Sequence, residues 1–333
     1  MAKVTIKDVA KEAGVSIATV SNALNGVDVL NPDTKKRVLD AVEKLQYIPN
    51  LNGRYLKSGE TKMIGFFTNS IAGPYFCTLM DSMCRQCERR GYSMNIIVTK
   101  DANAIMGNIM GRRIDGAVIF EDTVVKEEAI SKIEKADISV VFLDREISKK
   151  RIASVVFDSY KGAYEATKYL INLGYKKIGF IESTDNMLDS YQRKRGFQAA
   201  LKEYGLNPEE AVILQGAFEE EFTYNAVKTF IHFQSEQMPE AILAGNDLSA
   251  IGCIKALISD GYRVPEDVSV MGFDDIDISQ YFTPPLTTVS NPIARQGMLA
   301  IDTLIDMIDD KEDGSIKRLD GKLVIRESCT VKR

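Results

Sequence analysis

The chain contains no run of about 20 consecutive apolar residues, the length that a membrane-spanning helix requires. Its first residues, MAKVTIKDVA, lack the apolar core of a signal peptide. We therefore expect a cytoplasmic protein with no membrane partner, in which Cys77, Cys84, Cys87, Cys253 and Cys329 are free thiols. Cys84 and Cys87 form a C-x-x-C pair with no second pair, so a buried-thiol interpretation is favoured over a zinc or redox site. We expect neither a metal nor a cofactor.

Motifs of common enzyme classes are also missing. No G-x-G-x-x-G follows a strand pattern, and neither a P-loop nor a G-x-S-x-G elbow occurs. The single histidine, His232, lies in a helical stretch. Asp274 and Asp275 could act as an acid and a base, but neither a nucleophile nor a metal ligand accompanies them. An enzyme is therefore the disfavoured alternative.

The charge of the chain is unevenly distributed. The 333 residues are 45% apolar and 27% charged, which is typical of a soluble protein with two or three domains. Residues 1–58 carry nine Lys and Arg against six Asp and Glu, a net charge of +3. The whole chain has a net charge of −5, so residues 59–333 have a net charge of −8. This division predicts a basic head that binds nucleic-acid phosphates and an acidic body that senses a ligand.

Three short helices are predicted in the first 47 residues. Thr5 can cap the first helix, which ends at Gly14, and Ser16 can cap a second helix with small, uncharged outer side chains. Asn31-Pro32 begins a third helix, which runs through Leu45. Two short helices joined by a turn with glycine indicate a helix-turn-helix. Composition alone does not separate a DNA-reading second helix from an ordinary solvated helix.

Residues 4–56, with VTIKDVAKEAGVS, TVSNALNG and KRVLDAVEKLQYIPN, resemble the head and hinge of the lactose-repressor (LacI/GalR) family. The resemblance implies that Ile17, Ala18 and Asn22 contact bases in the major groove. Asn pairs best with adenine and apolar side chains contact thymine methyls, so we predict an operator half-site rich in A·T at these steps. Further DNA-binding residues implied for the head, including phosphate contacts, are Thr5, Ser16, Thr19, Ser21 and Asn25.

Residues 49–57, PNLNGRYLK, resemble the hinge of that family, which becomes helical on DNA and inserts a leucine into the minor groove. Leu56 holds the leucine position, and Asn50, Arg54 and Tyr55 are the other implied DNA contacts. Asn52-Gly53 departs from the family pattern, since Gly costs a helix about 1 kcal/mol relative to Ala. A plain exposed linker is the alternative.

From Met63 onward, short β-rich runs alternate with helical patterns, which predicts a parallel, doubly wound α/β architecture. The predicted strands are 63–68, 93–99, 116–121, 139–144, 154–158, 177–182, 241–245, 268–274, 286–290 and 322–327. The predicted helices are 76–90, 126–135, 161–173, 190–204, 220–232, 247–260 and 292–309.

The body also resembles the lactose-repressor family, in segments such as RRIDGAVI, LGYKKIGFI, GNDLSAIG and RVPEDVSVMGFDD. The resemblance implies an α/β fold with a three-helix helix-turn-helix head and a two-lobed body like that of periplasmic binding proteins. We expect the head over 1–47, the hinge over 48–60, an N-terminal lobe over 61–158 and 291–318, and a C-terminal lobe over 159–290 and 319–333. Crossovers between the lobes are expected near 157–161, 288–292 and 318–322.

An effector, expected to be a sugar, is implied between the two lobes. Carboxylates, amides and guanidinium groups bind sugar hydroxyls, while aromatic rings cover the C–H face. A packing role for Phe157 and Phe218 and a helix-capping role for Asp247 are open alternatives. The implied effector-binding residues are Tyr75, Phe76, Asp144, Phe157, Arg193, Phe218, Asn246 and Asp274.

The sequence thus predicts a repressor of a sugar-utilisation operon that binds a pseudo-palindromic operator as a homodimer. The expected dimer interface involves 76–90, 250–258 and 276–286. Control by a protein corepressor, as in catabolite control within the same family, is the alternative. The run Thr283-Pro284-Pro285 departs from the arginine of that regulator, which favours a small ligand. We expect no tetramerising tail after VIRESCTVKR.

Overall fold

The computed structural model describes residues 4–24, 30–48, 60–120, 125–143, 145–183 and 187–332. The chain divides into two compact units, a head (Met1–Thr61) and a body (Lys62–Arg333). Among the described residues, no helix combines the length and the apolar character that a membrane span needs.

The head contains the three predicted helices, α1 (Ile6–Ala13), α2 (Ile17–Leu24) and α3 (Pro32–Lys44). Thr5 donates its backbone N–H and its hydroxyl to the Asp8 carboxylate, at 2.9 and 2.7 Å, and so fixes the start of α1. Gly14 ends α1 in the left-handed conformation, with φ +64°. The predicted cap residues are confirmed here. The three helices pack around the fully buried side chains of Val9, Val20 and Val38.

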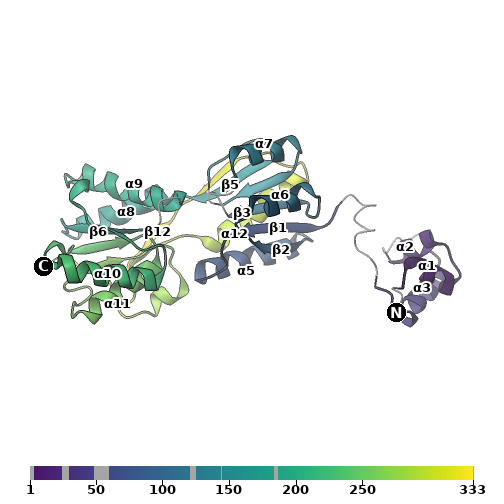
Figure 1. Cartoon of the computed structure of the whole chain (residues 1–333), viewed down its shortest axis with the longest axis horizontal. Helices are drawn as coiled ribbons and strands as arrows, with labels where there is room; N and C mark the ends of the chain where they lie inside the picture. Colours follow the sequence, from purple (N-terminus) through teal and green to yellow (C-terminus); the bar gives the residue numbers. More distant parts are fainter. Residues whose placement is uncertain are drawn as a thin grey trace. The chain divides into compact units, whose positions relative to one another are not determined.

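The first sheet of the body is wholly parallel and has the order β11-β5-β4-β3-β1-β2. One face packs on α5 and α12, and the other on α6 and α7, which gives the lobe two separate cores (Figure 1). Its strands are β1 (Met63–Thr68), β2 (Ser93–Val98), β3 (Gly116–Phe120), β4 (Ser139–Phe142), β5 (Ile152–Phe157) and β11 (Ile316–Leu319). Its helices are α5 (Pro74–Arg89), α6 (Ala102–Met110), α7 (Glu127–Lys135) and α12 (Ile293–Ile308).

The second sheet is also parallel and has the order β7-β6-β8-β9. Helices α8 and α9 cover one face, and α10 and α11 cover the other (Figure 1). Its strands are β6 (Ile178–Glu182), β7 (Ile213–Gln215), β8 (Ala241–Ala244) and β9 (Ser269–Met271). Its helices are α8 (Ser159–Asn172), α9 (Leu188–Glu203), α10 (Glu220–Gln234) and α11 (Asp247–Ser259), with short 3-10 turns η1 (Pro208–Glu210), η2 (Ser235–Gln237) and η3 (Asp277–Gln280).

The chain passes between the two sheets after β5, after β10 (Thr288–Ser290) and between β11 and β12 (Lys322–Val324). Strands β10 and β12 pair with each other in antiparallel register. The predicted doubly wound, two-lobed α/β fold is confirmed, and each predicted strand and helix overlaps an observed one. The sequence missed β7, β11 and α6.

Candidate functional site

A cavity of about 130 Å³ lies between the two sheets, at the carboxyl ends of strands from both lobes. Phe120 ends β3, Asn246 follows β8 and Asp274 follows β9, so this is the edge where open α/β sheets bind ligands. The lining residues are Ala72, Gly73, Pro74, Tyr75, Phe76, Phe120, Met187, Asp189, Arg193, Phe218, Asn246, Asp247, Leu248, Asp274 and Ile276.

The first lobe contributes an aromatic wall. The Phe76 and Phe120 ring centroids are 5.3 Å apart, and Tyr75 lies 5.5 Å from Phe76 and 5.9 Å from Phe120. The Tyr75 hydroxyl donates to Gln296 Oε1 at 3.0 Å. Gln296 is fully buried, and its Nε2 donates to the backbone oxygens of Leu143 at 3.3 Å and Val155 at 2.9 Å. The position of Tyr75 is therefore set by α12 and the two strands β4 and β5.

Arg193 on α9 is the polar centre of the second lobe's wall, and it is 3% exposed. Its Nη1 donates to the Gly245 backbone oxygen, and its Nη2 donates to Asp274 Oδ1 at 3.3 Å. The guanidinium carbon lies 4.0 Å from the Phe273 ring centroid and 5.4 Å from that of Phe218. The guanidinium is thus held by a carbonyl, a carboxylate and two aromatic faces.

Asp274 is buried and occupies a backbone conformation that is unusual for a residue with a side chain. Its φ is +110°, and Phe218 across the wall has φ +60°. Such strain is stored at sites whose surroundings enforce it. Asn291 donates to Asp274 Oδ1 at 3.0 Å. Burial raises the pKa of Asp274 to about 6, although the charge of Arg193 and the bond from Asn291 lower it.

Asn246 and Asp247 both lie on the lining, but their polar atoms bind the protein. Asn246 caps α11, because its Oδ1 accepts from Ser249 N at 2.9 Å, and its Nδ2 donates to the Phe218 backbone oxygen at 3.0 Å. The Asp247 carboxylate accepts from Ile276 N, Ser279 Oγ and Thr288 Oγ1, at 2.9, 2.6 and 2.5 Å. The capping residue is therefore Asn246, where the sequence suggested Asp247.

Six of the eight predicted effector residues line this cavity: Tyr75, Phe76, Arg193, Phe218, Asn246 and Asp274. Phe157 is not on its lining, since it is 5% exposed and packs in the core of the first lobe. Asp144 lies outside the described residues. Sequence reasoning missed Asp189, Phe120 and Met187. Asp189 stands one helical turn before Arg193, and Phe120 ends a predicted strand, so both positions carried a usable signal.

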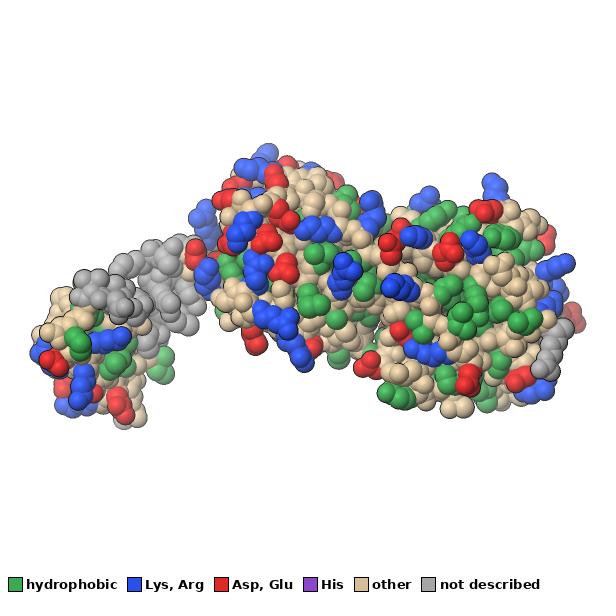
Figure 2. Space-filling model, turned by 180° about the vertical axis from the view of Figure 1, so that it is seen from behind, with side chains coloured by type: hydrophobic (Ala, Val, Ile, Leu, Met, Phe, Trp, Pro, Cys, Tyr) green, Lys and Arg blue, Asp and Glu red, His purple; other side chains and the backbone are tan. Residues whose placement is uncertain are grey.

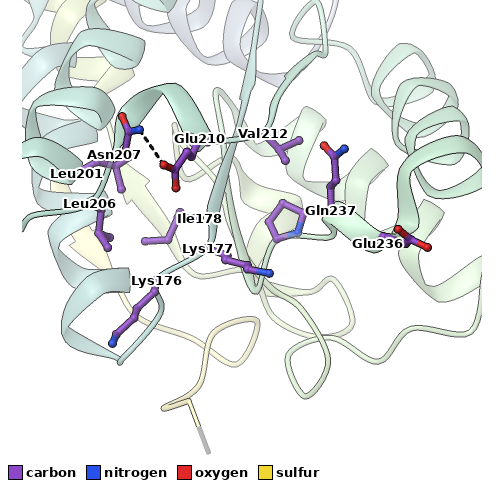
Figure 3. Close-up of a pocket in the computed structure, with 12 residues that line it drawn as sticks. Lys176, Lys177, Ile178, Leu201, Leu206, Asn207, Glu210, Val212, Glu236 and Gln237 are labelled. Atoms are coloured by element: carbon purple, nitrogen blue, oxygen red, sulfur yellow. Dashed lines mark hydrogen bonds between the residues drawn. The ribbon is translucent and has the colours of Figure 1, made fainter.

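A larger cavity, of about 290 Å³, lies in the second lobe at the amino ends of β6 and β7 (Figure 3). Asn207 Nδ2 donates to Glu210 Oε1 at 2.9 Å within it. The charged side chains on its lining, Lys176, Lys177, Glu210 and Glu236, are all exposed. Exposed charges are already solvated, so this hollow lacks the buried polar groups of the inter-lobe cavity.

The C-x-x-C pair is not a reactive site, because burial raises the pKa of both thiols. Cys87 is buried on α5 beside half-buried Cys84, and burial raises the pKa of the Cys87 thiol to about 12. Among the residues that the structure describes, no cluster of three His, Cys, Asp or Glu could hold a metal ion. Asp275 forms an ion pair with Arg326 at 2.7 Å, whereas Asp274 binds Arg193, so the two carboxylates have separate partners.

The second helix of the head exposes two of the three predicted base-reading side chains. Ile17 is 45% exposed, Ala18 is exposed and Asn22 is half-buried. Ser16 Oγ accepts from Thr19 N at 3.1 Å and lies 2.9 Å from Thr19 Oγ1, which caps α2. Ser21 is half-buried. Asn25, Asn50, Arg54, Tyr55 and Leu56 lie outside the described residues.

Comparison with known proteins decides the family. A model of bacterial regulatory proteins of the lacI family matches residues 5–50, and a periplasmic binding protein-like domain model matches residues 167–329. The HTH-type transcriptional repressor PurR of Haemophilus influenzae (strain PittEE) is 35% identical over 333 residues, which cover 97% of this chain and 98% of that protein. The same repressor from Edwardsiella ictaluri (strain 93-146) is 34% identical over 97% of this chain and 96% of its own length.

The chain belongs to the lacI family of bacterial regulatory proteins. It is a DNA-binding transcription repressor and not an enzyme. The lac repressor dimer bound to operator and the anti-inducer ONPF has the same fold, with a TM-score of 0.85 over 99% of this chain and all of that one, at 24% identity. The Escherichia coli repressor ascG is 28% identical, with a TM-score of 0.72 over 80% of this chain and 99% of that one.

Proposed function

We propose that this lacI-family repressor binds a two-half-site operator as a homodimer, and that a small ligand in the inter-lobe cavity controls operator affinity. The observation that carries the proposal is the cavity itself, whose lining combines an aromatic wall from one lobe with the buried Arg193–Asp274 pair of the other. A site built from two lobes favours a small ligand over a protein corepressor, because binding there acts directly on the lobe arrangement. Within this proposal the chain acts in the cytoplasm.

We assign operator reading to α2, with Ile17, Ala18 and Asn22 as base contacts. The exposure of Ile17 supports this role, since a large apolar side chain in the first turn of a helix otherwise costs free energy in water. Thr5, Ser16, Thr19, Ser21 and Asn25, with the hinge residues Asn50, Arg54, Tyr55 and Leu56, complete the proposed DNA contacts. The visible faces of both the head and the body mix Lys and Arg with Asp and Glu (Figure 2), so the assignment rests on the side chains of α2.

Selection of operators from a random pool tests this assignment. The wild type should enrich half-sites with A·T pairs at the steps facing Ile17 and Asn22, and Asn22→Ala should relax the preference for adenine. An unchanged base preference in Asn22→Ala contradicts the assignment of Asn22. Lys202→Ala, an exposed position on α9 of the body, is the control and should select the same half-sites as the wild type.

A sugar remains our proposed ligand. A lacI-family regulator from Enterococcus faecium with bound ribose is 25% identical to this chain, with a TM-score of 0.74 over 81% of it. The PurR relatives carry a name that specifies no sugar, so the identity needs direct measurement. Calorimetry against a sugar panel should give binding that is lost in Asp274→Ala and Arg193→Ala. Unchanged affinity in both variants contradicts the pocket.

The expected dimer interface exposes large apolar side chains. Ile258 is 50% exposed, Ile278 47% and Tyr281 75%. The proposal predicts that Tyr281→Arg lowers the mass measured by light scattering to that of a monomer. Phe233→Arg changes a side chain of matching exposure, 74%, outside the expected interface and should leave the dimer intact. A dimeric Tyr281→Arg contradicts the role of this segment.

We also propose the division expected from the sequence: a head over 1–47, a hinge over 48–60, and lobes over 61–158 with 291–318 and over 159–290 with 319–333. The membership of β11 in the first sheet and the pairing of β12 with β10 support the last boundary. Limited proteolysis should cut first within 48–60 and release an intact body.

A further inference from the structure

We infer that the inter-lobe cavity selects ligands that present hydrogen-bond donors and carry no negative charge. The inference rests on the proposed function, which assigns the effector to this cavity. Neutral polyhydroxyl compounds and protonated amines both satisfy this chemistry, whereas phosphate esters and carboxylic acids do not.

The first step concerns the only cation on the lining. Among the lining residues, which are all described, there is no lysine and the single arginine is Arg193. Both of its terminal nitrogens donate to protein oxygens, Nη1 to Gly245 and Nη2 to Asp274. The buried Arg193 Nε has no partner among the described residues, and a neutral hydroxyl or carbonyl oxygen can accept from it. The charge of the guanidinium is already balanced by the buried Asp274 carboxylate, with which an anion would have to compete. Arg193 therefore positions Asp274 and leaves Nε as a donor for a neutral acceptor.

The second step concerns the acceptors. Asp274 Oδ1 accepts both the bond from Arg193 and the bond from Asn291, and no described residue donates to Oδ2. Asp189 repeats this arrangement, because its Oδ1 accepts from Ser159 Oγ at 2.9 Å while its Oδ2 lies 3.8 Å from Arg193 Nη2, beyond hydrogen-bond distance. Two carboxylates on the lining thus each retain an acceptor oxygen. Asn246, the remaining polar candidate, uses both ends of its amide within the protein.

The third step is the charge balance. The lining carries Asp189, Asp247 and Asp274 against Arg193, a formal net charge of −2 when every carboxyl group is ionised. Burial raises the pKa of Asp247 to about 7, and with that carboxyl group protonated the lining still carries −1. Apart from Asn246, the rest of the lining is aromatic or apolar, so little solvent is available to screen a further negative charge. Ligand hydroxyl groups can donate hydrogen bonds to the carboxylates, and a ligand ammonium group would also balance their charge. The rings of Phe76 and Phe218 can pack against the C–H face of a sugar ring or against a cation.

Fractionated metabolites provide the test on the full-length protein. A bacterial metabolite extract is separated on an anion-exchange column at pH 7.5, and thermal unfolding of the body is followed with the unretained and the retained fraction. The unretained fraction should raise Tm, and the retained anions should not. A Tm increase confined to the retained fraction overturns the inference and leaves the proposed function intact. If neither fraction raises Tm, the proposed function fails and the inference falls with it.

A cation-exchange step then distinguishes the two sources, since amines are retained and neutral sugars pass through. Asp189→Asn keeps the size of the side chain and an acceptor for Ser159, and it should weaken binding of the active fraction at least tenfold. Asp189→Lys should abolish that binding and allow anions of the retained fraction to bind. Glu209→Gln, an exposed carboxylate on η1, is the matched control. Wild-type affinity in both Asp189 variants overturns the role of Asp189.

Discussion

Removal of two methyl groups from the core of the head should strongly destabilise the head without any change in the stability of the body. Val38 on α3 is 0% exposed and packs against Val9 and Val20. Val38→Ala loses the burial of about two methyl groups at about 0.8 kcal/mol each, and a residual cavity adds to this, so the cost is about 2 kcal/mol. A head of about 45 residues has a total stability of only about 2–7 kcal/mol, so the loss is a large fraction of the total.

Differential scanning calorimetry of the full chain measures this effect as a shift of the head's own transition. Unfolding entropy scales with length, and for about 45 residues a loss of 2 kcal/mol corresponds to a fall in Tm of about 20 °C. The transition of the body should not move. Leu39→Ala changes the neighbouring side chain, which is 46% exposed, and should shift the head by only a few degrees. Equal shifts in both variants, or a shift of the body transition with Val38→Ala, would refute the separate core of the head.

Three further variants test the body. Gln296→Ala removes the hydrogen-bond partner of the Leu143 and Val155 oxygens and of the Tyr75 hydroxyl. In chemical denaturation it should lower the free energy of unfolding of the body by about 3 kcal/mol. The control, Gln198→Ala at a half-buried position on α9, should lower it by under about 0.5 kcal/mol. Gly196→Ala should lower the Tm of the body, because the added Cβ would lie 2.1 Å from the Tyr160 backbone oxygen. Gly107→Ala adds a Cβ with no atom within 4 Å and should raise the stability of the body by about 0.5–1 kcal/mol through helix propensity. Equal effects of the two variants would contradict the backbone contact between α8 and α9. As the pH is lowered below about 6, ligand affinity should fall by up to about tenfold per pH unit, because Asp274 has its pKa raised to about 6 and becomes protonated there. Asp274→Asn should remove this pH dependence in calorimetry. A pH dependence that persists in the variant would assign the titration to another group.

The sequence predicted the fold well where helix and strand patterns are strong and where caps are local. Thr5, Gly14 and Asn31 act within a few residues of their own position, so their roles follow from short motifs. The missed elements depend on partners. Strand β11 has the sequence IKRL, with exposed Arg318, and is a strand because β5 pairs with it. Helix α6 contains Gly107, which weakens its helical pattern.

The candidate site was predictable in composition but not in its hydrogen bonds. The carboxyl-end rule and the family resemblance indicated Arg193, Asn246 and Asp274. Neither could show that Asn246 uses its whole amide within the protein, or that Arg193 donates to Gly245. Those bonds depend on the close approach of α9, β8 and the loop at Phe218, which are distant in sequence. The spacing of Asp189 from Arg193 was a usable signal, but the bond that Asp189 accepts from Ser159 on α8 depends on tertiary packing.

The bonds at the start of α12 connect the two walls of the cavity. Asn291, which follows β10, donates to Asp274 in the second lobe, and Gln296, one turn into α12, accepts from Tyr75 in the first. Helix α12 in turn packs along α5, the helix that begins beside the aromatic wall. One short segment therefore bonds to a polar group in each wall of the cavity. A change in the separation of the walls would strain or break one of these two hydrogen bonds, so the segment from Asn291 to Gln296 links the two walls.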